Sequence, residues 1–415
     1  MIARLIACHE CDLLQRETAL RIGGSARCAR CGAQLYRNRP DGLNRALACT
    51  LGGLVMFGIA NAFPIVGLDV SGNLVETTLL GAVKMLYSQG VWPLAGLVLA
   101  TSFLMPLAEM CAMVYLLLPL TMNRVPRGGR AAFRALHAVR PWGMTEVLIL
   151  GFLVALVKLA AIAKVVPGLS LFAFGAVMLL ISGASASFDP RVAWARIEPR
   201  RSSFDLNVHA KTAAKAGLFV CHDCALISKA SPHAHAGRCP RCHSMLHFRK
   251  PNSISRTWAL LIAAMVLYIP ANVLPVMNTS SLFGVEKDTI MSGVAYLWTS
   301  GSWPLAVLVF IASIAVPMLK IIALTLLVLS TQMRARWLPV RRTRIYRIVE
   351  FVGRWSMLDI YVITVLVALV QFNALATIHA GAAAIAFGAV VVLTMLAAMA
   401  FDPRLIWDAA EDDHA

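Results

Sequence analysis

The chain alternates long apolar segments with shorter polar and basic ones. A hydrocarbon core about 30 Å thick is crossed by about 20 apolar residues of helix. Eight segments reach this length, at residues 43–63, 92–118, 144–165, 170–188, 256–277, 303–329, 356–378 and 382–401. Because backbone polar groups in lipid must be paired within the segment, each is predicted to be a helix.

Composition and charge agree with this pattern. Of the 415 residues, 59% are hydrophobic and 14% charged, against about 25% charged in soluble domains. All but five of the 38 Lys and Arg residues fall on one side of the predicted spans, and the five exceptions are Lys84, Lys158, Lys164, Lys287 and Lys320. The positive-inside rule therefore places both termini in the cytoplasm. The net charge of +17 records orientation and does not indicate a nucleic-acid partner.

The two halves of the chain repeat one another. The string ANAFP at 60–64 returns as ANVLP at 271–275, and FDPR occurs at both 188–191 and 401–404. Each half holds four predicted spans, an even number, so both halves face the same way. We expect an all-α polytopic membrane protein with eight transmembrane helices, built as two parallel four-helix repeats.

A four-cysteine cassette precedes each group of spans. Its members are Cys8, Cys11, Cys28 and Cys31 in the first copy, and Cys221, Cys224, Cys239 and Cys242 in the second. Two Cys-x2-Cys pairs predict a tetrahedral four-thiolate site in a small cytoplasmic zinc ribbon, rubredoxin-like in spacing. Zinc is the favoured metal at both sites, with iron as the alternative. A closed four-thiolate zinc site has no open position, so we expect structure and docking rather than catalysis.

These patterns predict five regions. They are 1–42 (zinc ribbon 1), 43–190 (transmembrane repeat 1), 191–255 (linker and zinc ribbon 2), 256–403 (transmembrane repeat 2) and 404–415 (acidic cytoplasmic tail). The basic connections at 124–140 and 334–354 predict either surface helices on anionic headgroups or plain topology anchors.

Ionisable residues inside predicted spans are costly and mark candidate functional sites. Glu109 and Lys320 occupy equivalent positions, each three residues after a proline, Pro106 or Pro317. Proline lacks the N–H that a helix needs, so both prolines are candidate helix breaks. Broken helices often build midplane binding sites in transporters.

Five residues are candidates for transport or proton coupling. Lys320 and Asp359 come first, and Glu109, Lys158 and Thr394 are further candidates. The competing interpretation is an interhelical ion pair, such as Glu109 with Lys320, that only holds the two halves together.

The chain lacks the sequence motifs of several enzyme classes. The chain contains no Gly-Lys dipeptide, hence no P-loop ATPase, and neither a Gly-x-Ser-x-Gly elbow nor a His-Glu-x-x-His helix. We therefore expect a protein that is not an enzyme.

The twin cassettes and the ANxxP, GxWP and FDPR elements resemble the paraquat-inducible protein A family, in the branch of lipophilic envelope-spanning tunnel protein A. The resemblance covers essentially the whole chain. It implies a multi-pass protein of the bacterial inner membrane. It also implies phospholipid transport across the cell envelope, with lipid loaded into or unloaded from a periplasm-spanning tunnel partner built of mammalian-cell-entry domains.

Three functions stay open at this point. The first is such a lipid transport subunit, with the proton gradient as the energy source. The second is a membrane redox protein whose rubredoxin-like iron sites act on quinone. The third is an ion or small-solute carrier that uses the broken helices.

Overall fold

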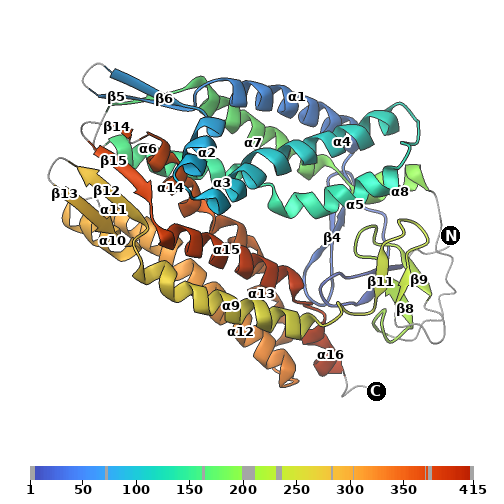
Figure 1. Cartoon of the computed structure of the whole chain (residues 1–415). Helices are drawn as coiled ribbons and strands as arrows, with labels where there is room; N and C mark the ends of the chain where they lie inside the picture. Colours follow the sequence, from blue (N-terminus) through green and yellow to red (C-terminus); the bar gives the residue numbers. More distant parts are fainter. Residues whose placement is uncertain are drawn as a thin grey trace.

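The computed structural model describes residues 5–70, 73–160, 164–198, 211–229, 236–281, 284–301, 303–369, 371–372 and 376–411. Most of these residues are helical (Figure 1). The helices run between two ends of the molecule: the ribbon end, which carries the short strands of residues 5–37 and 218–247, and the hairpin end, which carries the β-hairpins of residues 66–77 and 277–288. Among them, seven helices are long and apolar enough to cross a membrane. The expectation of a mostly helical membrane protein is therefore confirmed.

The helices fall into two halves in chain order. The first half contains α1 (Gly42–Ala62), α2 (Leu79–Ser88), α3 (Trp92–Leu99), α4 (Met105–Thr121), α5 (Gly129–Val139), α6 (Thr145–Ala160), α7 (Leu169–Ser187) and α8 (Pro190–Ile197). The second half contains α9 (Ser253–Val273), α10 (Ile290–Thr299), α11 (Trp303–Phe310), α12 (Val316–Gln332), α13 (Pro339–Trp355), α14 (Leu358–Leu369), α15 (Ala382–Ala400) and α16 (Leu405–Glu411).

Two predicted spans prove too long. In the segment predicted at 144–165, α6 ends at Ala160 and strand β7 (Lys164–Pro167) follows. In the segment at 356–378, α14 has 12 residues and is followed by strands β14 (Gln371–Phe372) and β15 (Ala376–Ala380). Apolar residues continue past both helix ends, and hydropathy alone does not distinguish such a strand from a helix.

The hairpin end carries two antiparallel sheets, so the all-α prediction is wrong there. The first sheet orders β6 (Asn73–Thr77), β5 (Val66–Val70) and β7 (Lys164–Pro167). The second orders β13 (Gly284–Asp288), β12 (Met277–Ser281), β15 (Ala376–Ala380) and β14 (Gln371–Phe372). The backbone carbonyls of Pro64 and Pro275 lie so close to Gly168 and Gly381, respectively, that a β-carbon at either glycine would collide with them. Glycine at these two positions lets the last long helix of each half begin against its sheet.

Each predicted helix break is preceded by a π-helical turn. Ala100–Leu104 lies directly before Pro106 in the first half, and Ile311–Ala315 before Pro317 in the second. In this turn an N–H bonds to the carbonyl five residues earlier, as Met105 does to Ala100. The extra residue gives the helix room for a proline that cannot donate.

A shared apolar core joins the two halves. It includes Phe152 of α6, Phe174 of α7, Tyr361 of α14 and Phe387 of α15, all almost fully buried. Helix α6 packs against α14, while α1 packs along α7 and α9 along α15. The core therefore lies between equivalent elements of the repeat.

The two ribbons lie side by side at the ribbon end. Ribbon 1 is built of β1 (Leu5–Ala7), β2 (Leu14–Arg16), β3 (Ser25–Arg27) and β4 (Gln34–Arg37). Ribbon 2 is built of β8 (Leu218–Val220), β9 (Ile227–Lys229), β10 (Ala236–Arg238) and β11 (Met245–His247). An antiparallel bridge between Leu13 and Thr212 links them.

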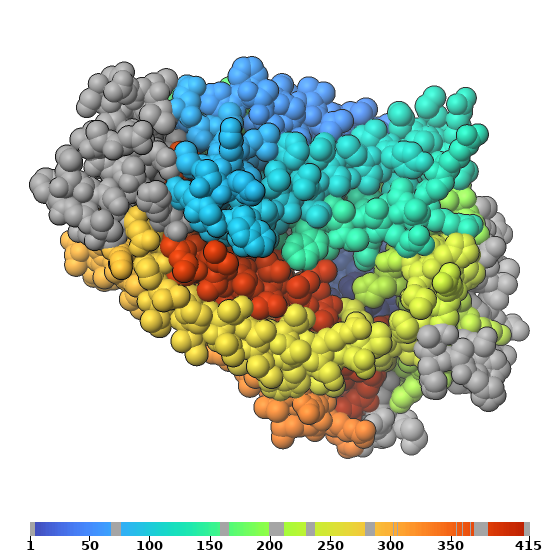
Figure 2. Space-filling model, in the orientation of Figure 1, coloured from blue at the N-terminus to red at the C-terminus, as the bar shows by residue number. Residues whose placement is uncertain are grey.

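Each ribbon is buried against the half that it does not precede. The cysteines of ribbon 1 share an apolar cluster with Leu324, Tyr346 and Trp407 of the second half. Those of ribbon 2 share one with Phe133 and Trp194 of the first half. Figure 2 shows ribbon 2, in yellow-green, against the teal helices of the first half. The docking is thus crossed with respect to chain order.

The FDPR elements tie the ends of the last long helices to their surroundings. Asp402 is 1% exposed and accepts hydrogen bonds from the guanidinium of Arg404 and from the backbone N–H of Lys250. Its own backbone N–H donates to Ser253 at the start of α9. Asp189, its equivalent, instead caps α8 by accepting from the N–H of Arg191.

The Asp402 carboxylate should make part of the stability pH-dependent. Burial alone would raise its pKa, but the hydrogen bonds and charge of Arg404 and the N–H of Lys250 outweigh burial and hold the pKa at about 2. A lowered pKa adds stability above the unfolded value, and this contribution is lost as pH falls through the folded value. We expect Asp402→Asn to lower stability by about 2 kcal/mol near neutral pH.

Thermal unfolding in detergent, followed from pH 6 downward, measures this effect. The difference between wild type and Asp402→Asn should shrink between about pH 4 and pH 2. The exposed Asp41→Asn serves as control and should unfold like the wild type. A difference that stays constant over this range would contradict the assignment.

Candidate metal centres and intramembrane polar sites

The four Cys-x2-Cys pairs share one local conformation. The residue after each pair has a positive φ, and these residues are Asp12, Gly32, Ala225 and His243. In each loop the backbone N–H of that residue donates to the carbonyl of the first cysteine, at 2.9–3.0 Å. The tight turn aims both thiols of the pair at one point, which is why the spacing of two residues matters.

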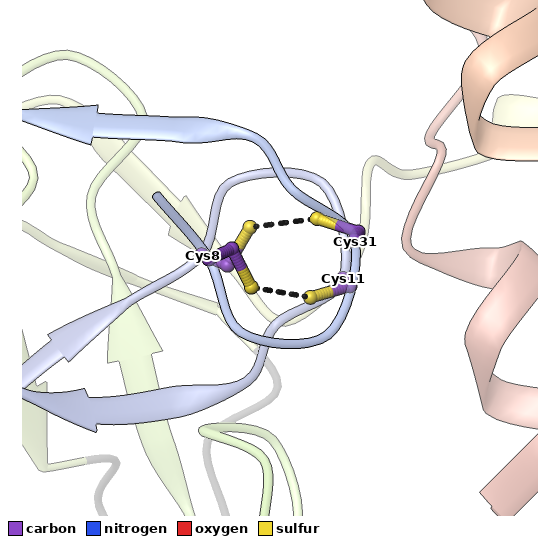
Figure 3. Close-up of side chains that lie close together, drawn as sticks. Cys8, Cys11 and Cys31 are labelled. Atoms are coloured by element: carbon purple, nitrogen blue, oxygen red, sulfur yellow. Dashed lines mark hydrogen bonds between the residues drawn. The ribbon is translucent and has the colours of Figure 1, made fainter. Parts of the chain in front are cut away.

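The eight cassette cysteines come together as two clusters, as their spacing predicts. Figure 3 shows the ribbon 1 thiols converging. Sulfur–sulfur distances are 3.5 Å for Cys8–Cys31 and Cys11–Cys28. In ribbon 2 they are 3.4 Å for Cys221–Cys242 and 3.5 Å for Cys224–Cys239. Disulfides would need about 2.05 Å, so all eight are free thiols.

This geometry fits a tetrahedral metal ion. Four sulfurs placed about 2.3 Å from a zinc ion lie about 3.8 Å apart, close to the distances found. The ligand atoms of each cluster all lie within 4.8 Å of one another, and all eight cysteines are buried. The hydrogen bond between Cys11 and Cys28 raises the pKa of the Cys11 thiol and lowers that of Cys28. Each cluster can therefore bind a metal, which would replace the shared protons.

The first polar site on a candidate membrane helix surrounds Glu109, which is 7% exposed on α4. Its carboxylate lies 3.8 Å from Nε of Arg140, in the short turn between α5 and α6. Both residues line a cavity of about 150 Å³ together with Glu146 of α6. Glu146 accepts a hydrogen bond from Ser182 of α7 at 3.0 Å. The structure thus groups two carboxylates and one arginine at the ribbon end of the first half.

The second polar site surrounds Lys320, which is 2% exposed on α12. Its ammonium donates to the Ser356 hydroxyl at 3.4 Å and lies beside Gly353. Ser356 and Gly353 stand where the first half has Gly143 and Arg140. The span helix therefore carries the acid in the first half and the base in the second.

The remaining sequence predictions, an ion pair between Glu109 and Lys320 and the candidates Thr394, Lys158 and Asp359, have different outcomes. No ion pair joins Glu109 to Lys320, whose side chains are both described, because Arg140 and Ser356 lie closer to them. Thr394 is buried on α15, and its hydroxyl donates to the carbonyl of Val391 in the same helix. The side chains of Lys158 and Asp359 lie outside the described residues, although their helices α6 and α14 are described.

Two tyrosines near the π-helical turns were missed by the sequence argument. Tyr361 of α14 is fully buried and donates to the hydroxyl of Thr101 at 2.9 Å, linking the two halves. Tyr268 of α9 donates to the carbonyl of Ile314 at 3.2 Å. The signal for both was a tyrosine inside an apolar span, since a buried hydroxyl needs a partner.

Seven candidate membrane helices and two four-cysteine clusters define the class: a polytopic membrane protein with paired metal-binding ribbons. The paraquat-inducible protein A family model matches residues 43–198 and again 254–411. The chain belongs to this family. The same model matches twice, once in each half, and both ribbons lie outside the matched segments.

Curated relatives agree with the family. Intermembrane transport protein PqiA of Escherichia coli (strain K12) is 36% identical over 98% of this chain and 96% of the relative. Lipophilic envelope-spanning tunnel protein A of the same strain is 31% identical, over 98% and 92%. A probable intermembrane transport protein of Haemophilus influenzae is 27% identical, over 97% and 96%. These names describe transport proteins, not enzymes, and the family expected from the sequence is confirmed. No solved structure matches.

Proposed function

We propose that this protein is the inner-membrane subunit of an intermembrane phospholipid transport system. It loads lipid into, or unloads it from, a periplasm-spanning partner built of mammalian-cell-entry domains. The observation that carries the proposal is the pair of polar sites at Glu109 and Lys320, buried in helices long enough to cross a membrane. Ionisable residues inside membrane helices are costly and are candidates for a transport pathway, and relatives of this chain are named intermembrane transport proteins.

The proposal includes a topology. Eight spans form two parallel four-helix repeats, with α6 and α14 as the third span of each half. The ribbon end, both termini and both metal sites face the cytoplasm, and the hairpin end faces the periplasm. The basic residues support this orientation, because all but five fall in the segments predicted on the cytoplasmic side of the spans. Zinc is the proposed metal in both ribbons.

Energy would come from the proton gradient. Lys320 and Asp359 in the second half are the proposed proton carriers, and Glu109, Lys158 and Thr394 are further candidates for a role in transport. The sequence supports this choice because it contains no P-loop. Lysine and aspartate side chains both titrate, so each can take up and release a proton.

Purification in mild detergent followed by mass spectrometry tests the proposal. We expect phospholipid and a mammalian-cell-entry protein to copurify with the full chain. Loss of both on washing with a lipid-free detergent buffer, while the protein stays folded, would argue for an ion or small-solute carrier instead. Metal analysis of the same sample separates the redox alternative, since two zinc ions per chain without visible absorbance would exclude iron centres.

A further inference from the structure

The crossed docking rests on two arginines at equivalent repeat positions. Arg347 of α13 donates from Nη2 to the carbonyl of Cys31 at 2.8 Å. Arg134 of α5 donates from Nη1 to the carbonyl of Cys242 at 2.6 Å. Arg134 and Arg347 are 213 residues apart, and each binds the fourth cysteine of the ribbon that precedes the other half.

A second pair of contacts also joins each ribbon to the half that it does not precede. Arg30, in the second knuckle of ribbon 1, lies 4.1 Å from the ring centre of Trp407 on α16. Its equivalent Arg241, in ribbon 2, lies 5.8 Å from that of Trp194 on α8. Both tryptophans are buried. Two independent contacts on each side therefore follow one pseudo-twofold rule, which an accidental contact would not do.

Helices α13 and α5, which carry Arg347 and Arg134, continue toward the polar sites around Lys320 and Glu109. Nine residues after Arg347 comes Ser356, which accepts the hydrogen bond from Lys320. Six residues after Arg134 comes Arg140, which lies beside Glu109. At 1.5 Å per residue these separations correspond to roughly 13 Å and 9 Å. Fixing the arginine therefore fixes the position of the polar group farther along the same segment.

We infer that Arg134 and Arg347 are positioning residues through which each ribbon sets the polar site of the opposite half. Ribbon 1 holds α13 and thereby the Ser356 partner of Lys320. Ribbon 2 holds α5 and thereby the Arg140 partner of Glu109. The inference goes beyond the proposed lipid transport, because it does not depend on what the protein carries.

The charge of a metal-bound ribbon would strengthen its contact with an arginine. A zinc ion bound by four thiolates leaves a formal charge of about −2, which an adjacent guanidinium compensates. Metal binding also orders the loop that presents the cysteine carbonyl, because the knuckle forms around the ion. On the ribbon 1 side the guanidinium also binds the Glu10 carboxylate, with 2.8 Å between Nε and Oε1. Removing the metal should therefore make the contacting helix more dynamic, which is α13 for ribbon 1 and α5 for ribbon 2.

Hydrogen–deuterium exchange on the full chain in detergent tests the crossed coupling. In Cys8→Ser/Cys11→Ser, amides of α13 should exchange about tenfold faster or more, while those of α5 stay unchanged. Cys221→Ser/Cys224→Ser should give the reverse. Faster exchange of α5 in the ribbon 1 variant, or no change in either helix, would overturn the inference.

Point variants keep the test informative if a ribbon variant fails to fold. Arg347→Gln retains every cysteine and should speed α13 exchange without changing the metal content, and Arg347→Lys should restore part of the protection. The exposed Arg344→Gln, on the same helix, is the matched control and should exchange like the wild type. Equal exchange in Arg347→Gln and Arg344→Gln would refute the positioning role. None of these outcomes depends on lipid copurification, so the inference and the proposed function can fail separately.

Discussion

Replacement of Lys320 by methionine is expected to abolish phospholipid transfer while leaving the protein folded. Lys320 is 2% exposed, and the Ser356 hydroxyl is the hydrogen-bond partner that the described residues provide for its ammonium. A buried ammonium without an ion-pair partner costs desolvation energy, so an apolar side chain of similar length should leave the fold at least as stable. A variant that is at least as stable as the wild type yet inactive would show that the lysine serves transport.

Transfer of labelled phospholipid to the purified partner, together with thermal unfolding, measures both effects. Lys84→Met, on the exposed face of α2, is the matched control and should leave transfer intact. Lys320→Arg keeps a charge that cannot be released, so it should also be inactive if the proton must leave. Full transfer by Lys320→Met or Lys320→Ala would end the case for this residue.

Loss of one metal centre is the second large effect. Cys28→Ser/Cys31→Ser should reduce bound metal from two ions per chain to one, because ribbon 1 then keeps only two thiolates. Structural zinc contributes about 10–16 kcal/mol to folding small domains, far more than the few apolar side chains of this ribbon. We therefore expect ribbon 1 to unfold locally and the thermal midpoint to fall.

Elemental analysis with limited proteolysis checks this prediction. Proteolytic cleavage should appear within ribbon 1 and not within ribbon 2. Cys111→Ser is the matched control, because this exposed cysteine of α4 lies outside both clusters. Two metal ions in the double variant would contradict the four-thiolate assignment.

Cysteine spacing was the most predictive feature of the sequence. Two residues between ligands allow only a tight turn, so Cys8 to Cys31 and Cys221 to Cys242 could be placed without knowing the fold. Hydropathy located the long apolar helices but neither the short helices α2 and α10 nor the helix ends near the hairpin end, where apolar residues of β7 and β15 continue the pattern. Hydropathy measures partition into lipid, and it carries no signal for strand pairing.

Contacts between the halves were beyond the sequence argument. Glu109 and Lys320 occupy equivalent positions, which suggested a mutual ion pair, but each meets a group from its own connecting segment. Likewise, the basic connections at 124–140 and 334–354 were expected to serve the membrane surface or topology. Two of their arginines also bind cysteine carbonyls 108 and 316 residues away in sequence, which the sequence argument did not predict. No local periodicity encodes such distant partners.

Because of the crossed docking, the partner helices of the two ribbons become available at different times during synthesis. Ribbon 2 is made after α5, so its docking surface already exists when the ribbon emerges. Ribbon 1 is made first, and 316 residues separate Cys31 from Arg347. At 5–20 residues per second the ribosome needs roughly 15–60 seconds to supply that partner. During this interval ribbon 1 has no α13 partner and can contact only its own half, as Arg191 of α8 does with Glu17 and Tyr36. A chain that stops before α13 would leave the Cys31 carbonyl without Arg347.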